Sequence, residues 1–391
     1  MDAEISCQGS MGEWFRLERN PDSDVLAVVF SHVSEQPGRF SFYGSFRDVA
    51  VNKLFVNTPC NGWYRDGVPG LGGDVDSAAG GMRILMQQVA PRTVVCIGNS
   101  MGAYAALLFG VLINADRILA IGPETLVDQP GSRSRGFLAG RSPPAFYADL
   151  LPVLSRPAAD RQTSILIGES DPVDLECACR VAHLPGMGLR SLRGVGHEVP
   201  ALLHRFGAWR PLIRGFVRDG GLPAMLPLEG RILESGDAAD ALLEGRRLRL
   251  AGDRRAARTR LGHCLALYPD ADLAHDEIGI IEREEGAFAK AEAAHRLALR
   301  LAPDRAQYSL HLAQALEAQG RFGEALAVYD QVCALEPGNR FLGASRDKAR
   351  GRLQDTAQAA WGTPGLFQPG LFKPGLLQKD DTPATSAPPL V

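Results

Sequence analysis

Short apolar runs alternate with longer helix-like segments through the first 220 residues of the chain. The runs carry apolar residues at successive positions, which is typical of strands buried on both faces; they lie at 14–17, 25–30, 53–56, 94–97, 118–121, 164–167 and 189–192. Segments that favour helices lie at 77–89, after Met101 and after Pro200. The alternation predicts an α/β fold, with a mostly parallel sheet and helices on both of its faces.

The second half of the chain follows a 34-residue period. A glycine, an alanine and a proline repeat in phase, at Gly252, Gly286 and Gly320, at Ala257, Ala291 and Ala325, and at Pro269, Pro303 and Pro337. The glycine suits a tight turn between two helices, the alanine suits their close packing, and the proline ends the second helix. The region 235–340 resembles three tetratricopeptide repeats, and 341–353 is predicted to form a capping helix.

Composition narrows the class of protein. The chain has 391 residues, enough for two or three domains, and its net charge of −3 gives no reason to expect a nucleic acid as a partner. Seven scattered cysteines form neither a disulfide pattern nor a zinc-binding spacing. The first twelve residues lack the pattern of a signal peptide, and no run approaches the roughly 20 apolar residues of a membrane helix. We therefore expect a soluble, cytoplasmic protein with no membrane span.

The candidate nucleophile lies where a strand meets a helix. Gly98, Ser100 and Gly102 form the pattern G-x-S-x-G between the apolar run 94–97 and an alanine-rich helix. The two glycines would let strand and helix close around a sharp turn that exposes the Ser100 hydroxyl. The helix N-terminus there, notably the backbone N–H of Met101, would face developing negative charge.

Two later segments supply candidates for the rest of a catalytic triad. Asp171 follows a strand in the turn 168–171, and His197 lies in the glycine-flanked loop 194–200. The chain order serine, acid, histidine is that of the α/β-hydrolases, and residues 14–215 resemble a compact α/β-hydrolase domain. The resemblance implies that Ser100 attacks an acyl carbon, that His197 transfers the proton and that Asp171 orients the imidazole.

The resemblance also implies residues around the reacting atoms. An oxyanion hole would use the backbone N–H groups of Met101 and Val33, although Val33 stands where the family commonly has glycine. His32 in the same loop, together with Trp63 and Tyr64 in a glycine-rich loop, are candidate pocket residues.

The acid and the histidine of the triad each have competitors in the sequence. Asp171 precedes a proline, and Asp-Pro is also a common helix start, so its side chain can serve as an N-cap instead. Glu169 and Asp174 are the competing acids, while His32 and His183 are the competing histidines.

We expect three regions in the chain. Residues 1–225 would form the hydrolase-like domain, with a loop-rich cap at about 122–162 that contains Arg133, Arg135 and Arg141. These arginines favour an anionic or sugar-linked substrate, unless the segment is only a solvated loop. Residues 235–353 would form the repeats, and 354–391 a disordered tail in which Pro-Gly-Leu recurs every five residues.

The sequence therefore favours a serine-type hydrolase that cleaves an ester or related acyl bond of a small-molecule or acylated substrate. Acyl transfer on the same fold is one alternative, and a non-catalytic interaction scaffold is another. We expect no cofactor and no metal, and a protein partner in the groove of the tetratricopeptide repeats. The histidines of the repeats are expected to be surface or packing residues; they are His263, His275, His295 and His311.

Overall fold

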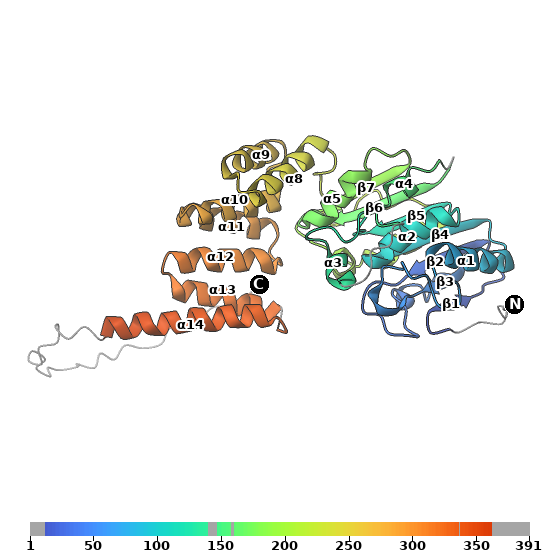
Figure 1. The fold of residues 1–391 in the computed structure, drawn as a ribbon, viewed down its shortest axis with the longest axis horizontal. Coiled ribbons are helices and arrows are strands. Elements are labelled where there is room, and N and C mark those ends of the chain that lie inside the picture. The colour runs from blue at the N-terminus through green and yellow to red at the C-terminus, as the bar shows by residue number, and fades with distance from the viewer. Residues whose placement is uncertain (1–11, 140–146, 158–159, 336, 362–391) are drawn as a thin grey trace, which may run out of the picture.

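The first half of the chain folds around a single β-sheet. In the computed structural model the described residues are 12–139, 147–157, 160–335 and 337–361, so Arg141 and the predicted tail repeats lie outside them. Within these ranges seven strands join in the order β1-β3-β2-β4-β5-β6-β7 (Figure 1). The strands are β1 (Phe15–Glu18), β2 (Val25–Phe30), β3 (Asn52–Val56), β4 (Thr93–Asn99), β5 (Arg117–Ile121), β6 (Gln162–Gly168) and β7 (Met187–Leu192).

The strand directions confirm the predicted mostly parallel sheet. Strand β1 pairs antiparallel with β3, and every other neighbouring pair is parallel. Strands β1 and β2 follow one another along the chain, but β3 lies between them in the sheet. Parallel strands place all their carboxyl ends at one edge, where ligands bind in open α/β sheets. The loops after β4, β5, β6 and β7 therefore meet at that edge.

Helices cover both faces of the sheet, because alternate residues of its strands pack on opposite sides. On β2, Leu26, Val28 and Phe30 join one apolar core, and Ala27 and Val29 join the other. The first core includes α1 (Val75–Val89), α2 (Met101–Leu112) and α5 (Pro172–Val181), and the second includes α6 (Val199–Arg205) and α7 (Trp209–Asp219). Two short helices, α3 (Arg133–Leu138) and α4 (Leu151–Leu154), lie in the predicted cap.

The second half is a stack of antiparallel helices (Figure 1). The helices are α8 (Gly236–Leu250), α9 (Arg254–Leu267), α10 (Asp272–Glu284), α11 (Phe288–Leu301), α12 (Ala306–Ala318), α13 (Phe322–Leu335) and α14 (Arg340–Trp361). The three in-phase glycines turn the chain within each hairpin at φ between 74° and 88°, and the three in-phase alanines are fully buried. These positions confirm the roles predicted from the period. Helix α14 ends at Trp361, so the predicted start of the tail at 354 was wrong.

Polar contacts and an apolar core join the two halves. Helix α5 packs against α8, and the first core continues into α8, α9 and α10. Glu169, at the end of β6, is 1% exposed and accepts hydrogen bonds from Ser191 Oγ, the Ile232 N–H and the hydroxyl of Tyr268 on the helical side. None of the helices in the described ranges is both long and apolar enough to cross a membrane.

Candidate active site at the carboxyl edge of the sheet

Ser100 occupies a strained turn between β4 and α2. Its backbone lies at φ 56° and ψ −122°, which is unfavourable for a residue with a side chain, and the residue is 8% exposed. A Cβ on Gly98 would lie 2.0 Å from the carbonyl oxygen of Gly102, and a Cβ on Gly102 would lie 2.3 Å from that of Phe30. Both glycines are therefore required for the close packing of strand and helix that the sequence predicted.

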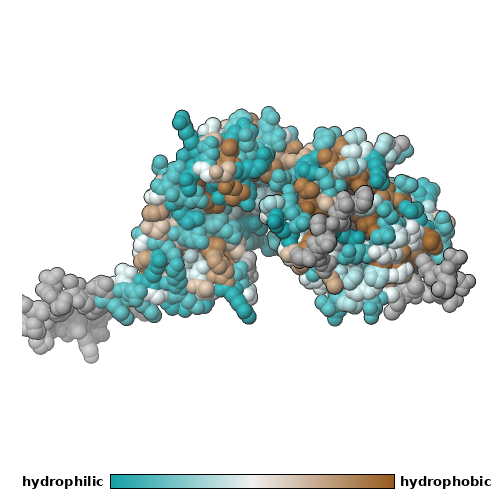
Figure 2. Space-filling view, viewed as in Figure 1, coloured by the Kyte–Doolittle hydropathy of each residue, from teal (hydrophilic) through white to brown (hydrophobic). Residues whose placement is uncertain are grey.

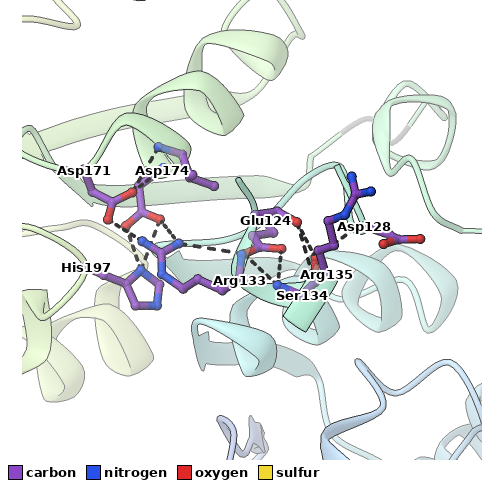
Figure 3. Close-up of polar contacts among 10 residues, drawn as sticks. Glu124, Asp128, Arg133, Ser134, Arg135, Asp171, Asp174 and His197 are labelled. Atoms are coloured by element: carbon purple, nitrogen blue, oxygen red, sulfur yellow. Dashed lines mark hydrogen bonds and ion pairs between the residues drawn. The ribbon is translucent and has the colours of Figure 1, made fainter. Parts of the chain in front are cut away.

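The imidazole of His197 is paired with Asp174 (Figure 3). Nδ1 of His197 lies 2.9 Å from Oδ2 and 3.1 Å from Oδ1 of the carboxylate, so its N–H donates to the acid. The Asp174 side chain is completely buried, and that of His197 is 16% exposed. The other ring nitrogen, Nε2, has no hydrogen-bond partner among the described residues. This arrangement fixes the imidazole and leaves Nε2 able to accept a proton.

Asp171 does not contact His197 in the way that the sequence predicted. It is the N-cap of α5, where its Oδ1 accepts hydrogen bonds from the backbone N–H groups of Val173 and Asp174, each at 3.0 Å. The turn spacing was misleading because α5 begins directly after Asp171, and the first helical turn brings Asp174 round to the histidine. The competing acid Asp174 thus has the position assigned to Asp171.

Arg133, on α3, neutralises both acids from the cap. Its Nη1 lies 2.9 Å from Asp174 Oδ1, and its Nη2 donates to Asp171 Oδ2. Burial raises the pKa of Asp171, but Arg133, the α5 backbone and His197 outweigh it and hold the pKa below its ordinary value. Burial lowers the pKa of Arg133, but the acids around it raise the pKa overall, so the guanidinium stays charged.

The start of α3 is itself held against the edge of the sheet. Glu124 follows β5, is 2% exposed and accepts from the backbone N–H groups of Arg133, at 2.7 Å, and Ser134 (Figure 3). A carboxylate at a helix N-terminus is stabilised by the helix dipole. Glu124 therefore holds Arg133 in the position from which it contacts Asp171 and Asp174.

Residues at the end of β5 connect Ser100 to the His197–Asp174 pair. The Ser100 N–H donates to the carbonyl of Ile121 at 2.9 Å, and the next residue is Gly122. A Cβ on Gly122 would lie 2.9 Å from His197 Nδ1 and from Asp174 Oδ2. The serine and the pair thus contact adjacent residues of one strand end. Within the described residues no hydrogen bond joins Ser100 to His197, and catalytic hydrogen bonds are often long without substrate.

The predicted oxyanion donors lie in two different segments, the start of α2 and the loop after β2. Met101 is the first residue of α2, so its N–H has no partner within the helix. Val33 follows β2, and its carbonyl oxygen lies 2.8 Å from Nδ1 of His32. Nε2 of His32 is 3.7 Å from Glu35 Oε1, so this ring is held within its own loop. The competing His183 is exposed.

The two aromatic pocket candidates are both buried. Tyr64 is fully buried, and its hydroxyl donates toward the carbonyls of Ser31 and Val56 at 2.9 and 3.1 Å, so it is a core residue and its assignment to the pocket was wrong. Trp63 is 1% exposed and packs on Phe137 of α3 with ring centroids 5.6 Å apart. Trp63 supports the cap, and Phe137, 41% exposed, presents the aromatic surface.

A cavity of about 820 Å³ lies beside the His197 loop, between the sheet and the helices. Gly196 and Glu198, the two neighbours of His197, line it, as do Arg305, His311 and Phe341 from the helical half. Arg305 packs so closely on Gly196 that a Cβ there would lie 2.0 Å from its Nη1. Figure 2 shows the surface hollowed between the two halves of the molecule.

Comparisons with known proteins give local likenesses. No family model matches the chain, and no curated protein matches it. The sheet half is similar to the capsule O-acetyltransferase of Neisseria meningitidis serogroup A, with 15% identity, a TM-score of 0.39 and coverage of 52% of this chain and 91% of that one.

The helical half is similar to tetratricopeptide domains. The first such domain of Spaghetti (RPAP3), bound to an HSP90 peptide, gives 21% identity and a TM-score of 0.30, covering 31% of this chain and 98% of that one. The TPR2B domain of yeast Sti1, in complex with an Hsp70 peptide, gives 18% identity and a TM-score of 0.28, covering 32% and 99%.

Two site residues were not assigned from the sequence. Asp174 appeared there only as a competing acid; the signal for it was its place in the first turn of a helix that Asp171-Pro172 begins. Arg133 appeared only as one of three cap arginines. Its contact with acids about 40 residues later depends on how the cap folds over the sheet, which a local pattern does not encode.

Proposed function

We propose that the chain is a serine-dependent hydrolase of the α/β-hydrolase type that cleaves an ester or related acyl bond. Ser100 is the nucleophile, His197 the general base and acid, and Asp174 the residue that orients the imidazole. The observation that carries the proposal is the strained Ser100, whose N–H donates to Ile121 at the end of β5, next to Gly122, against which the His197–Asp174 pair packs.

The proton transfers follow from the positions of the ring nitrogens. Because Nδ1–H of His197 donates to Asp174, Nε2 carries the lone pair that takes the Ser100 proton as Oγ attacks the acyl carbon. The bond from the acyl carbon to the alcohol oxygen then breaks, and Nε2 returns the proton to that alcohol. Water attacks the acyl-serine in the same way and releases the acid. The N–H groups of Met101 and Val33 are the donors for the oxyanion of both steps.

The direct test is turnover of activated esters. Wild-type protein is expected to hydrolyse p-nitrophenyl acetate or a longer p-nitrophenyl ester with saturation kinetics. Ser100→Ala and His197→Ala are each expected to lower kcat by about a thousandfold or more. A matched control is Ser77→Ala, which removes an exposed serine hydroxyl in the first turn of α1. Equal rates in wild-type and Ser100→Ala protein would exclude Ser100 as the nucleophile.

Acyl transfer is the second candidate for the same site. The observation that favours it is the cavity of about 820 Å³ beside the His197 loop, which has room for an acceptor molecule. Adding a series of alcohols and sugars during ester turnover separates the two reactions. If the enzyme transfers the acyl group, the amount of acylated acceptor should rise with acceptor concentration while the amount of free acid falls. If it only hydrolyses the ester, free acid should be the sole product.

We also propose that the helical half holds a protein partner in this cavity, as a tetratricopeptide module does. Support comes from Phe341, which lines the cavity and is 61% exposed. A photo-crosslinking amino acid at position 341 is expected to capture a defined protein in the source cells. The same group at Leu250, which is 64% exposed but outside the cavity lining, should not capture it. Identical capture from both positions would contradict a specific groove.

A further inference from the structure

Three side chains that the candidate active site does not use converge inside the helical half. They are Asp276 on α10, His295 on α11 and His311 on α12, one from each of three successive helices. Nδ1 of His295 lies 2.8 Å from Asp276 Oδ1, and Nδ1 of His311 lies 2.9 Å from both carboxylate oxygens. One ligand atom from each residue falls within 4.8 Å of the others. From the sequence, both histidines were expected to be only surface or packing residues.

The cluster holds an acid away from water without an arginine or lysine. The Asp276 side chain is 3% exposed, that of His295 is 0% exposed and that of His311 is 12% exposed. Among the described residues, the two imidazoles are the only ion-pair partners of Asp276. A buried carboxylate is retained when a positive charge compensates it, and a bound cation supplies that charge.

The helix that carries Asp276 leaves space for the His295 ring. Gly279 lies inside α10, where glycine is an unfavourable residue. A Cβ at this position would lie 2.4 to 2.7 Å from Cε1, Nδ1 and Nε2 of His295. Any other residue at 279 would displace the ring from Asp276, so the three side chains occupy a shaped site.

An outer partner and a route to solvent complete the arrangement. The side-chain nitrogen of Gln307, one turn before His311 on α12, lies 2.6 Å from Nε2 of His311. When Nδ1 of His311 ligates a metal, its Nε2 carries the ring proton and needs an acceptor, which the Gln307 amide supplies once it is turned so that its oxygen faces the ring. Gln307 and His311 both line the cavity of about 820 Å³, so an ion can reach the cluster from solvent.

We propose that Asp276, His295 and His311 bind one divalent transition-metal ion, of which zinc is the representative. Two imidazoles and one carboxylate are ligands that suit zinc, cobalt or nickel, whereas calcium and magnesium require mainly oxygen ligands. Three protein ligands leave a fourth position of a tetrahedral ion for water. The ion would join three successive helices, and the proposal does not depend on the chemistry of Ser100.

The test uses the full chain without a histidine tag, dialysed against a chelator. Titration with Zn²⁺ by calorimetry, and with Co²⁺ by its visible absorption, is expected to give one saturable site per chain. Zinc binds an imidazole nitrogen that carries no proton, so in each neutral ring the proton moves from Nδ1 to Nε2 when Nδ1 becomes the ligand. The wild-type melting temperature should also rise with Zn²⁺.

Variants separate a metal site from a simple hydrogen-bonded cluster. Asp276→Asn and His311→Asn are expected to lose the site, and the exposed Gln307→Ala, which leaves the ligands in place, should weaken it by about tenfold. The control is His263→Asn, an exposed histidine on α9 outside the cluster, which should bind as wild type does. Circular dichroism checks that each variant is folded. The proposal would be overturned if wild-type protein showed no saturable binding of Zn²⁺ or Co²⁺. It would also be overturned if the Gln307→Ala and His311→Asn variants both bound these ions as tightly as wild type does.

Discussion

Nδ1 of His197 lies 2.9 Å from Oδ2 of Asp174, in the first turn of α5, and the acid that begins that helix points elsewhere. Asp171 instead caps α5 and accepts a hydrogen bond from Nη2 of Arg133. Two acids three residues apart thus have different tasks. One orients the imidazole, and the other fixes the helix that carries the first.

Replacing each acid by its amide separates these tasks. Asp174→Asn is expected to lower the kcat of ester hydrolysis by about 10⁴-fold, because the amide does not hold the same tautomer of His197 or stabilise its imidazolium. Asp171→Asn keeps an N-capping side chain but loses the charge that pairs with Arg133, so it should cost about 1 kcal/mol of stability and little rate. Steady-state kinetics and urea unfolding of both variants measure the difference. A larger loss of rate in Asp171→Asn would assign the catalytic acid to Asp171.

Gly122 is predicted to be essential for placing the histidine. Gly122→Ala introduces a Cβ 2.9 Å from His197 Nδ1 and from Asp174 Oδ2, so the pair must move, and a displacement of about 1 Å can cost about a hundredfold in rate. Gly131→Ala is the matched control, because φ is also positive there but no atom lies within 4 Å. Both variants carry backbone strain, and only the first should lose esterase activity beyond its loss of stability. Equal kinetics in the two would show that the contact at Gly122 does not matter.

Arg133 is predicted to stabilise the site through its two acids. Arg133→Met should lower the free energy of unfolding by about 2 kcal/mol near neutral pH, since it leaves the buried Asp171 and Asp174 without their cation. The folded pKa of Asp171 lies below its unfolded value of about 3.9, so its stabilising contribution is present above that pH and is lost as the pH falls through the folded pKa. The deficit of the variant should therefore shrink below about pH 4.

Urea unfolding at several pH values checks this dependence. Arg135→Met is the control, since this neighbour on α3 is exposed, and it should change stability by less than about 0.5 kcal/mol. A deficit of Arg133→Met that stays constant down to the acid limit would show that the two carboxylates are not its source.

Asp272 lies where the two halves meet, and its contribution to stability should depend on pH in the direction opposite to that of Asp171. Burial raises its pKa to about 6, and its carboxyl lies against the Ser170 hydroxyl. Because the folded pKa is above the unfolded one, the stability that this group contributes is complete below about pH 4 and is lost as the pH rises through about 6. Asp272→Asn keeps a neutral side chain of the same shape at every pH.

Thermal unfolding of the two proteins tests this sign. The melting temperature of wild type relative to Asp272→Asn is expected to fall between about pH 4 and about pH 7 and to be constant above that. A difference that is independent of pH, or that grows as the pH rises, would place the carboxyl in an environment that favours its charge.

Local patterns predicted most of the fold. The strand 25–30 and the glycines of the 34-residue period were located from the sequence, because burial on both faces and a left-handed turn each restrict the residue type at a single position. Ser100 was located because a sharp strand-to-helix turn needs glycine on both sides of the serine. These are short-range requirements that a single segment carries.

The errors concern contacts between segments. The choice of Asp171 over Asp174 depended on where α5 begins relative to the histidine loop, and the choice of Tyr64 as a pocket residue depended on which way a loop turns its side chains. The Asp276–His295–His311 cluster has ligands separated by 19 and 16 residues, a spacing that only the stacking of three helices brings together. Tertiary packing decides such features.

The central claim is that Ser100 is an activated nucleophile, and labelling with a fluorophosphonate probe tests it most directly. Wild-type protein is expected to form one covalent adduct, located on Ser100 by peptide mass spectrometry. Labelling should be absent in Ser100→Ala and slowed strongly in His197→Ala and Asp174→Asn, while Asp171→Asn should label at nearly the wild-type rate. The absence of labelling in folded wild-type protein, or labelling of Ser100→Ala at the wild-type rate, would contradict the account.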